Sequence, residues 1–295
     1  MKEHNFGGDW TQKKLERVRK YLGAYTRIFA SNPRAKTLKP VYVDAFAGSG
    51  YRTESRRQTM NAELFPELSD PESQAFRKGS ARIALEVDPP FKGYLFVEQD
   101  PDFTCELLKL KQEFPEKASI IDIIESDSNE YLKKWCAETD WNVTRAVVFL
   151  DPYGMQVNWE LIEAIAATKA IDLWILFPIG MAVNRLLTTG GLPPEEWQGL
   201  LTRMFGTREW ESAFYDTHAT GDLFGEVTQK VKHADFRKIG QFFVSRLKTI
   251  FAGVSERPLP LMNSKNIPLF LLCFAAGNPR GASTAIKIAN HILKE

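Results

Sequence analysis

The sequence has few cysteines and no long apolar run. Its three cysteines (Cys105, Cys136 and Cys273) are widely spaced, so they form neither a disulfide framework nor a zinc motif. We expect free, buried thiols in a reducing cytoplasm. The longest apolar stretch, residues 173–183, is 11 residues long and contains a proline and a glycine. A membrane-spanning helix needs about 20 residues, and the charged N-terminus has no apolar signal-peptide region.

Histidine is also scarce, and the chain has almost no net charge. The four histidines, which are scattered along the chain, are His4, His218, His233 and His291. None of them has another histidine or a cysteine at the spacing of metal ligands. We therefore expect no metal requirement.

The net charge is +1, but residues 1–40 hold ten Lys/Arg against three acids, and residues 226–257 hold seven against three. Two basic regions suggest a local surface for a polyanion such as nucleic acid, although solvated helix faces explain them equally well.

The composition predicts one globular domain over residues 1–295, with 44% hydrophobic and 25% charged residues. Residues 1–40 form a basic helical segment, because apolar residues recur at helical spacing over 11–30. Residues 51–78 are polar and predict a loop insertion. Residues 190–257 are rich in aromatic residues and predict a helical insertion or cap.

Between these segments, strands and helices alternate. The predicted strands are 41–46, 94–97, 119–124, 146–150 and 173–177, and the helices between them are 101–114, 128–138 and 159–168. This order predicts an α/β fold with a Rossmann-like, doubly wound parallel sheet. Residues 258–262 and 267–274 predict an antiparallel C-terminal hairpin, followed by a last helix to Lys294.

Four acids follow consecutive predicted strands. Asp44, Glu98 and Asp151 come at or directly after strand ends, and Asp127 comes shortly after the third strand. Parallel strands place their carboxyl ends at one edge of the sheet, where ligands bind in open α/β folds. Clustered carboxylates repel one another, so they indicate a ligand with hydroxyl, amine or cationic groups.

The glycine loop after the first strand reads Asp44-Ala-Phe-Ala-Gly-Ser-Gly50. A nicotinamide cofactor favours Gly-x-Gly-x-x-Gly against a pyrophosphate, and the third glycine is missing here. An acid before the glycines suits an ammonium better than a phosphate. Gly50 is not followed by Lys-Ser/Thr, which excludes a P-loop. A nicotinamide oxidoreductase is therefore a weak third hypothesis.

This pattern of acids resembles the class I S-adenosylmethionine methyltransferases over residues 40–180. More narrowly, the chain is similar to the bacterial and phage three-Cys-motif partner family. The shared features are "DAFAGSG", "GSARIAL", "FVEQD", "FLDPYG" and "LLCFAAGNPRG". The cysteines that name this family belong to its partner protein. The resemblance implies S-adenosylmethionine as cofactor and a three-Cys-motif protein as partner.

The resemblance also implies residue roles. The methionyl end of the cofactor would be held by residues of the glycine loop: Asp44 and the backbone of Phe46, Gly48 and Gly50. Glu98 would accept hydrogen bonds from the ribose hydroxyls. Asp127 would accept one from the adenine amino group, although it could equally cap the next helix.

Asp151-Pro-Tyr-Gly154 would form the reaction end of the site. Methyltransferases acting on exocyclic nucleobase amines carry Asp/Asn-Pro-Pro-aromatic at this position. Asp151 and the Pro152 carbonyl would bind the two amine hydrogens, and Tyr153 would stack on the base. The second proline is missing, and the sequence resembles the Asp-Pro-Phe-Gly of tRNA guanine N2-methyltransferases.

Two functions remain open from the sequence. The first is a methyltransferase acting on a nucleobase amine in RNA or DNA, with phosphate contacts from Lys13, Lys14, Arg17 and Arg56. The second is a cofactor-binding accessory subunit that regulates a three-Cys-motif protein and transfers no methyl group itself. The Asp-Pro-aromatic motif favours the first function, and its altered spacing favours the second.

Overall fold

The computed structural model describes residues 9–48, 79–152, 154–222 and 225–294. They form an α/β fold around a mostly parallel sheet, in the order β3-β2-β1-β4-β5-β10-β8, with β9 also paired to β10. The first five strands run parallel, and β10 runs antiparallel to β5. The strands of this sheet are β1 (Lys39–Ala45), β2 (Gly93–Glu98), β3 (Ile121–Glu125), β4 (Thr144–Leu150), β5 (Ile171–Phe177), β8 (Gly253–Val254), β9 (Leu259–Met262) and β10 (Pro268–Ala276). The predicted fold class is confirmed.

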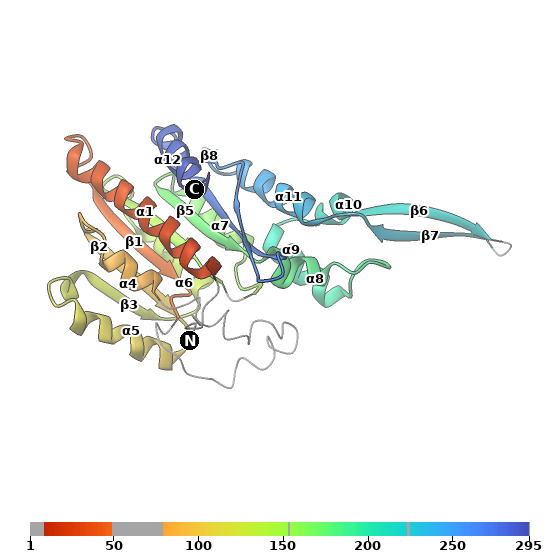
Figure 1. Cartoon of the computed structure of the whole chain (residues 1–295), viewed down its shortest axis with the longest axis horizontal. Helices are drawn as coiled ribbons and strands as arrows, with labels where there is room; N and C mark the ends of the chain where they lie inside the picture. The colour runs from red at the N-terminus through yellow and green to blue at the C-terminus, as the bar shows by residue number, and fades with distance from the viewer. Residues whose placement is uncertain (1–8, 49–78, 153, 223–224, 295) are drawn as a thin grey trace, which may run out of the picture.

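Helices cover the sheet. Figure 1 shows α1 and α12 crossing one face, where the two helices contact each other. The α-helices are α1 (Asp9–Ser31), α4 (Ser80–Leu85), α5 (Pro101–Glu113), α6 (Ser128–Glu138), α7 (Trp159–Ala167), α8 (Asn184–Leu186), α9 (Glu195–Phe205), α10 (Trp210–Phe214), α11 (Phe236–Lys248) and α12 (Ala282–Lys294). A 3-10 turn, η2 (Ala118–Ile120), precedes β3, and a π-helical turn, η3 (Ile179–Val183), follows β5.

The central strands are buried throughout because helices lie on both of their faces. Every residue of β2 and of β5 is buried, which explains their continuous apolar sequence. On one side, Tyr21 of α1 packs against Trp174 and Phe274. On the other, Phe177 stacks on Phe243 of α11 with ring centroids 4.0 Å apart. These contacts fix both helices to the middle of the sheet.

Residues 190–257 differ from the helical insertion expected from the sequence. Helices α9, α10 and α11 are present, but β6 (Tyr215–Asp222) and β7 (Gly225–Lys232) pair as an antiparallel ribbon. Figure 1 shows this ribbon projecting from the body of the molecule. The aromatic residues that suggested helices lie mostly in α9 and α10, whereas the ribbon carries β-branched residues, which favour strands. The loop insertion expected at 51–78 lies outside the described residues.

The cysteines and apolar segments agree only in part with the sequence analysis. Cys136 and Cys273 are free and buried, but Cys105 is exposed on α5. In the described part of the chain, no helix has both the length and the apolar character needed to cross a membrane.

The order of the strands creates one switch point. Strand β1 lies between β2 and β4, so the chain leaves β1 toward one edge of the sheet and later returns on its other side. In open α/β sheets, the crevice outside the carboxyl ends of two such strands is where ligands bind. Asp44 is the penultimate residue of β1, and Asp151 directly follows β4.

Candidate functional site

Asp44 is a buried carboxyl at this switch point. The Tyr42 hydroxyl, two residues earlier on the same strand face, donates to its Oδ2 at 3.1 Å. The pKa of Asp44 is raised to about 7, first by burial and second by the charge of Asp151. The hydroxyls of Ser80 and Tyr42 and the Lys14 ammonium lower this pKa. Its Oδ1 has no hydrogen bond of normal geometry within the described residues.

Asp151 pairs with a lysine from the N-terminal helix. The Lys14 ammonium donates to Asp151 Oδ2 at 2.7 Å, and the two side chains are 0% and 6% exposed. The same ammonium lies 5.3 Å from the centroid of the Phe149 ring. Lys14, Asp44 and Asp151 therefore form a buried cluster of one cation and two carboxyls.

This role of Lys14 was not predicted from the sequence. Lys14 was expected on the surface as a phosphate contact, but here its ammonium is enclosed and bound to Asp151. The signal was present in the sequence. Lys14 lies one turn before Val18, on the stripe that continues through Tyr21, Leu22 and Tyr25 and packs on the sheet. A lysine on a buried stripe needs a partner, and Asp151 is that partner.

The other predicted phosphate contacts have different surroundings. Lys13 is exposed on α1, as a phosphate contact must be. Arg17 was expected on the surface, but it is only 7% exposed. Arg56 lies outside the described residues. Lys14 and Arg17 are buried because both lie on the inner side of α1. The basic residues of this segment had been expected on its solvent-facing side.

The glycine loop begins with two residues in the left-handed region. Phe46 has φ 66° and Gly48 has φ 63°. A phenylalanine in this region is strained by about 1–3 kcal/mol, and such strain is found mostly at functional sites. The Gly48 N–H donates to Glu98 Oε2 at 2.7 Å, which ties the loop to the end of β2. Gly50 lies outside the described residues.

Glu98 accepts more hydrogen bonds than the sequence suggested. Its Oε1 accepts from the N–H groups of Gln99 and Asp100 at 2.9 and 3.0 Å, in addition to the Gly48 bond at Oε2. A carboxylate has about four acceptor positions, so roughly one is left for another donor. Glu98 thus shapes the glycine loop, and its role toward a ribose stays a prediction.

Asp127 caps a helix. It is the N-cap residue of α6, and its Oδ1 accepts from the Glu130 N–H at 3.0 Å. The alternative noted from the sequence, a capping role, is therefore what the structure shows. A bond from Oδ2 to an adenine amino group stays a prediction. The buried Asn129 next to it fixes α6 to the loop after β4 through Gln156 O and the Asn158 N–H.

The rest of the Asp-Pro-Tyr-Gly motif is partly described. Pro152 is buried beside Asp151, and Gly154 turns the chain with φ 72°. Tyr153 lies outside the described residues. Within the described ranges, no group of three or more His, Cys, Asp or Glu side chains is arranged to hold a metal ion. Metal independence therefore stays a prediction.

The order and direction of the strands define the type of fold. Five parallel strands in the order 3-2-1-4-5, an antiparallel strand next to the fifth and acids at the carboxyl edge are the arrangement of the class I methyltransferase fold. No protein-family model matches the sequence, and no curated protein matches it. The resemblance to the three-Cys-motif partner family stays a prediction from its motifs.

Solved structures give distant similarities. Protein LPL1258 from Legionella pneumophila is 13% identical, with a TM-score of 0.42, over 99% of this chain and 93% of that one. A spermidine synthase in complex with the transition-state analogue AdoDATO is 13% identical, with a TM-score of 0.41, over 95% of this chain and 64% of that one. Magnesium protoporphyrin IX methyltransferase from Synechocystis with bound S-adenosylmethionine is 11% identical, with a TM-score of 0.30, over 77% and 85%. Similarities this distant carry no substrate over to the present chain.

Proposed function

We propose that this protein is an S-adenosylmethionine-dependent methyltransferase whose acceptor is an exocyclic amine of a nucleobase in RNA or DNA. The observation that carries the proposal is the buried carboxyl pair, Asp44 and Asp151, at the switch point of a sheet of the methyltransferase type. Two enclosed carboxyls repel each other unless cations or hydrogen-bond donors reach them. Lys14 balances one of the two negative charges, and the other suits the ammonium of a ligand. A neutral acceptor amine adds no charge to the site.

The residues present fit the methionyl end of the cofactor. Asp44 Oδ1 is buried and lacks a normal hydrogen bond among the described residues, and an α-ammonium group would supply one. The cofactor would also favour the ionised form of Asp44, whose pKa is about 7 without it. The positive φ angles of Phe46 and Gly48 turn the chain directly after β1, the strand that carries Asp44.

Asp151 is the residue proposed to act on the acceptor. When bound, the cofactor supplies an electrophilic methyl group. The acceptor nitrogen would form a bond to this methyl group as the sulfur–methyl bond of the sulfonium breaks and leaves a neutral thioether. Positive charge develops on the nitrogen during transfer, and its proton would then be released to solvent. A carboxylate that accepts from the amine stabilises this charge more than it stabilises the neutral amine, which is how it accelerates transfer.

Lys14 occupies one oxygen of that carboxylate. Its ammonium donates to Oδ2 at 2.7 Å. The acceptor amine would therefore bind at Oδ1, with Lys14 keeping Asp151 ionised and oriented. In this proposal, Lys14 is a positioning residue.

The same ion pair favours a second candidate function. A buried lysine that holds Asp151 closes part of the position where an acceptor amine would bind. Such a site would suit an accessory subunit that binds S-adenosylmethionine, transfers nothing and regulates a three-Cys-motif partner. The partner and this regulation rest on the family resemblance alone.

Calorimetry and a transfer assay test the two candidates in order. We expect S-adenosylmethionine to bind and NAD not to bind. Transfer of labelled methyl groups to RNA and DNA, with and without the partner protein, then separates enzyme from accessory subunit. Binding without transfer to any nucleic acid, even with the partner present, would reject the nucleobase methyltransferase. Retained activity after exhaustive chelation would support metal independence.

Glu98 is expected to govern cofactor affinity. Glu98→Ala should weaken S-adenosylmethionine binding by about 2–4 kcal/mol, because a charged acceptor of the ribose is lost and three backbone N–H groups that shape the loop lose theirs. The measurement is calorimetry on folded protein. Glu125→Ala is the matched control, since Glu125 is the register partner of Glu98 on β3 and is exposed. Equal affinities of both variants would reject the cofactor assignment.

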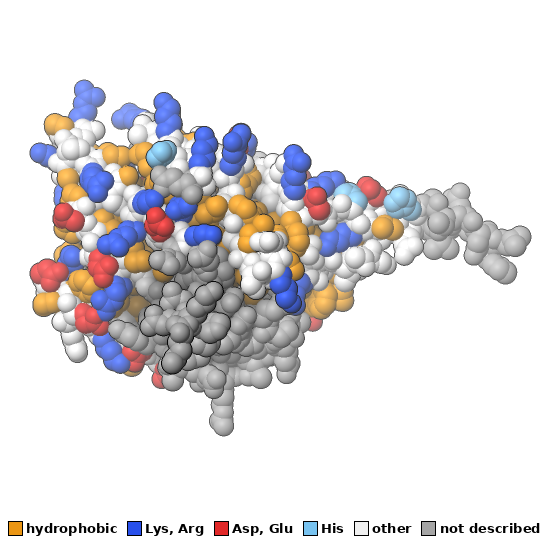
Figure 2. All heavy atoms as spheres, in the orientation of Figure 1, with side chains coloured by type: hydrophobic (Ala, Val, Ile, Leu, Met, Phe, Trp, Pro, Cys, Tyr) orange, Lys and Arg blue, Asp and Glu red, His pale blue; other side chains and the backbone are white. Residues whose placement is uncertain are grey.

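The surface offers basic residues for nucleic acid. In Figure 2, Lys and Arg side chains line the upper rim of the face shown, whereas acidic side chains gather at its lower left. Exposed basic residues on α1, on the turn that follows it and on α12 include Arg19, Lys20, Arg27, Lys36, Lys287 and Lys294. Exposed Lys13 lies at the other end of α1, beside Lys14 and therefore near Asp151. A basic face of this kind supports phosphate contacts.

Binding to nucleic acid should depend on Lys13 and Arg56. Replacing both with glutamine should weaken binding similarly for all sequences and reduce the slope of log affinity against log salt by about two, roughly one for each phosphate contact. Titrations at several salt concentrations measure this slope. Lys134→Gln, which removes an exposed lysine of α6, is the control. A double variant that keeps the wild-type slope would place the binding surface elsewhere.

A further inference from the structure

A cavity lies at the opposite edge of the sheet from Asp44 and Asp151. It has a volume of about 440 Å³ and lies between α1, the first residues of β4 and β5, and the start of α12. Asp172 in β5 pairs with Ala276 at the end of β10, so this edge holds the amino ends of the parallel strands. The cavity therefore shares no residue with the proposed methyltransferase site.

One wall of the cavity is aromatic. Tyr21, Tyr25 and Phe29 follow one another at four-residue spacing on α1, with ring centroids 6.2 and 4.7 Å apart. Tyr21 and Tyr25 are only 2% and 7% exposed, whereas Phe29 is half-buried, so the open part of this wall lies toward Phe29. Stacking on aromatic side chains stabilises bound nucleobases. A bare inorganic anion would leave this surface unused.

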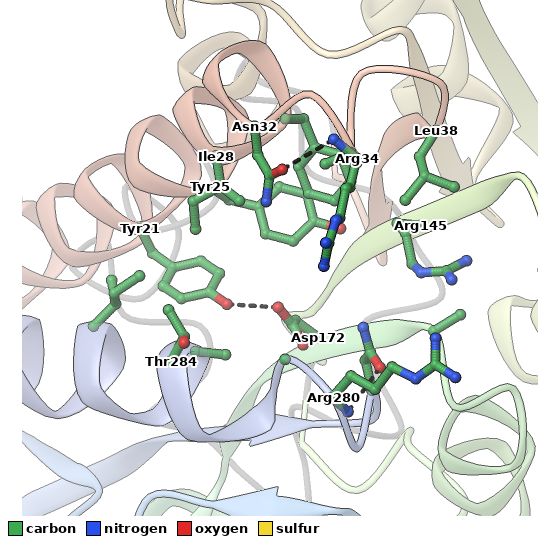
Figure 3. A pocket seen from close by; sticks show the side chains of 17 residues that line it. Tyr21, Tyr25, Ile28, Asn32, Arg34, Leu38, Arg145, Asp172, Arg280 and Thr284 are labelled. Atoms are coloured by element: carbon green, nitrogen blue, oxygen red, sulfur yellow. Dashed lines mark hydrogen bonds between the residues drawn. The ribbon is translucent and has the colours of Figure 1, made fainter.

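The floor of the cavity is a carboxyl group. The Tyr21 hydroxyl donates to Asp172 Oδ2 at 2.7 Å, as the dashed line in Figure 3 marks. Asp172 is 9% exposed and lines the cavity, and burial raises its pKa to about 6. At neutral pH it is mostly ionised, so it accepts hydrogen bonds from a ligand amine or imine N–H.

Three arginines surround the same cavity. Arg34 follows α1, Arg145 lies in β4 and Arg280 precedes α12. In Figure 3, Arg145 and Arg280 lie on the side away from Tyr21, and Arg34 reaches in from above. Arg145 donates to the carbonyls of Trp141 and Thr144, which hold the guanidinium without neutralising its charge. Among the described residues, none of the three forms an ion pair with a carboxylate.

Helix α12 adds a fourth contribution. Thr284 and Ala285 from its first turn line the cavity, as does Gly281 directly before the helix, so the helix begins there. The N-terminus of a helix carries partial positive charge and favours anions. Together with the arginines, it makes this end of the cavity suited to phosphate.

We propose that this cavity binds a purine nucleotide, with its base along the part of the wall formed by Tyr25 and Phe29 and its phosphate toward Arg34, Arg145 and Arg280. The carboxyl of Asp172 accepts from an amino or imino N–H of the base, a group that a fatty acid or a sugar phosphate lacks. The volume falls within the range of about 300–1,000 Å³ for small-ligand sites. Both a free nucleotide and the terminal nucleotide of a strand carry this chemistry.

Titration calorimetry on the full chain tests the proposal with GMP, AMP, ribose 5-phosphate, inorganic phosphate and a short oligonucleotide. We expect at least one purine nucleotide to bind about 10-fold or more tightly than ribose 5-phosphate, because the base adds stacking and the Asp172 contact. Inorganic phosphate should bind weakest. Tighter binding of the oligonucleotide than of the mononucleotides would identify a strand end as the source. Ribose 5-phosphate binding as tightly as GMP and AMP would overturn the proposal.

Two exposed arginines provide the variant. Arg34→Gln with Arg280→Gln should weaken nucleotide binding by about 10- to 100-fold, because two charge-assisted contacts are lost. Arg27→Gln is the matched control, since Arg27 is exposed on α1 and does not line the cavity. Both the double variant and the Arg27→Gln control should bind S-adenosylmethionine as tightly as the wild type does, which separates this site from the one at the carboxyl edge. An unchanged nucleotide affinity in the double variant would place the nucleotide elsewhere.

Discussion

Lys14→Met is expected to lower the free energy of unfolding by about 3–5 kcal/mol, the usual cost of removing one partner of a buried ion pair. Methionine fills a similar volume but leaves Asp151 and Asp44 enclosed without the ammonium that now lies 2.7 Å from Asp151 Oδ2. Chemical denaturation measures the change. Lys13→Met is the control, because Lys13 is the exposed neighbour on the same helix and such surface changes are usually within about 0.5 kcal/mol.

A double variant and a pH series sharpen this test. Asp151→Asn should restore part of the stability of Lys14→Met, because it removes the uncompensated charge. The pKa of Asp44, about 7 in the intact protein, should rise further without Lys14. A carboxyl whose folded pKa exceeds its unfolded value loses its contribution to stability as the pH rises through the folded pKa. The deficit of Lys14→Met should therefore be larger at about pH 8 than at about pH 5. Equal losses for Lys13→Met and Lys14→Met would contradict this account.

Asp151→Ala is expected to lower methyl-transfer turnover by about 10²–10³-fold, the scale for losing one electrostatic contact to charge that develops in a closed site. Affinity for S-adenosylmethionine should change little, since Asp44 and Glu98 are left in place. Single-turnover kinetics and calorimetry measure the two quantities separately. Asp151→Asn should retain part of the activity, because the amide oxygen still accepts a hydrogen bond from the acceptor amine.

Two comparisons make the Asp151 result specific. Tyr153→Ala should mainly weaken acceptor binding, by about 1–3 kcal/mol of lost stacking, and should leave turnover at saturation less affected than Asp151→Ala does. If Asp151→Ala preserved the biological activity while Glu98→Ala abolished it, the accessory-subunit function would replace the enzyme. That outcome would also agree with a structural role for the Lys14–Asp151 pair.

The positions of most elements follow from local pattern. The alternation of apolar strands and amphipathic helices predicted β1 to β5, α5, α6, α7 and the C-terminal hairpin within about two residues of where they lie. The burial of both sheet faces requires continuous apolar strands, so the sequence records this directly. The projecting ribbon of β6 and β7 was not predicted. A helix shows itself in the spacing of neighbouring residues, whereas strand preference depends more on the contacts a strand makes with the rest of the fold.

The sequence by itself determined the parallel sheet and the acids at its carboxyl edge. Asp44, Glu98 and Asp151 each lie at or directly after the end of a strand that the apolar pattern predicts. Only the tertiary structure decided their partners. Lys14 and Asp151 are 137 residues apart, and Tyr21 and Asp172 are 151 apart. Helix α1 crosses the sheet and so brings one cation to the carboxyl edge and three aromatic rings to the amino edge. Sequence spacing fixes which side chains share a helix face, but the packing of that face on the sheet decides which charges meet.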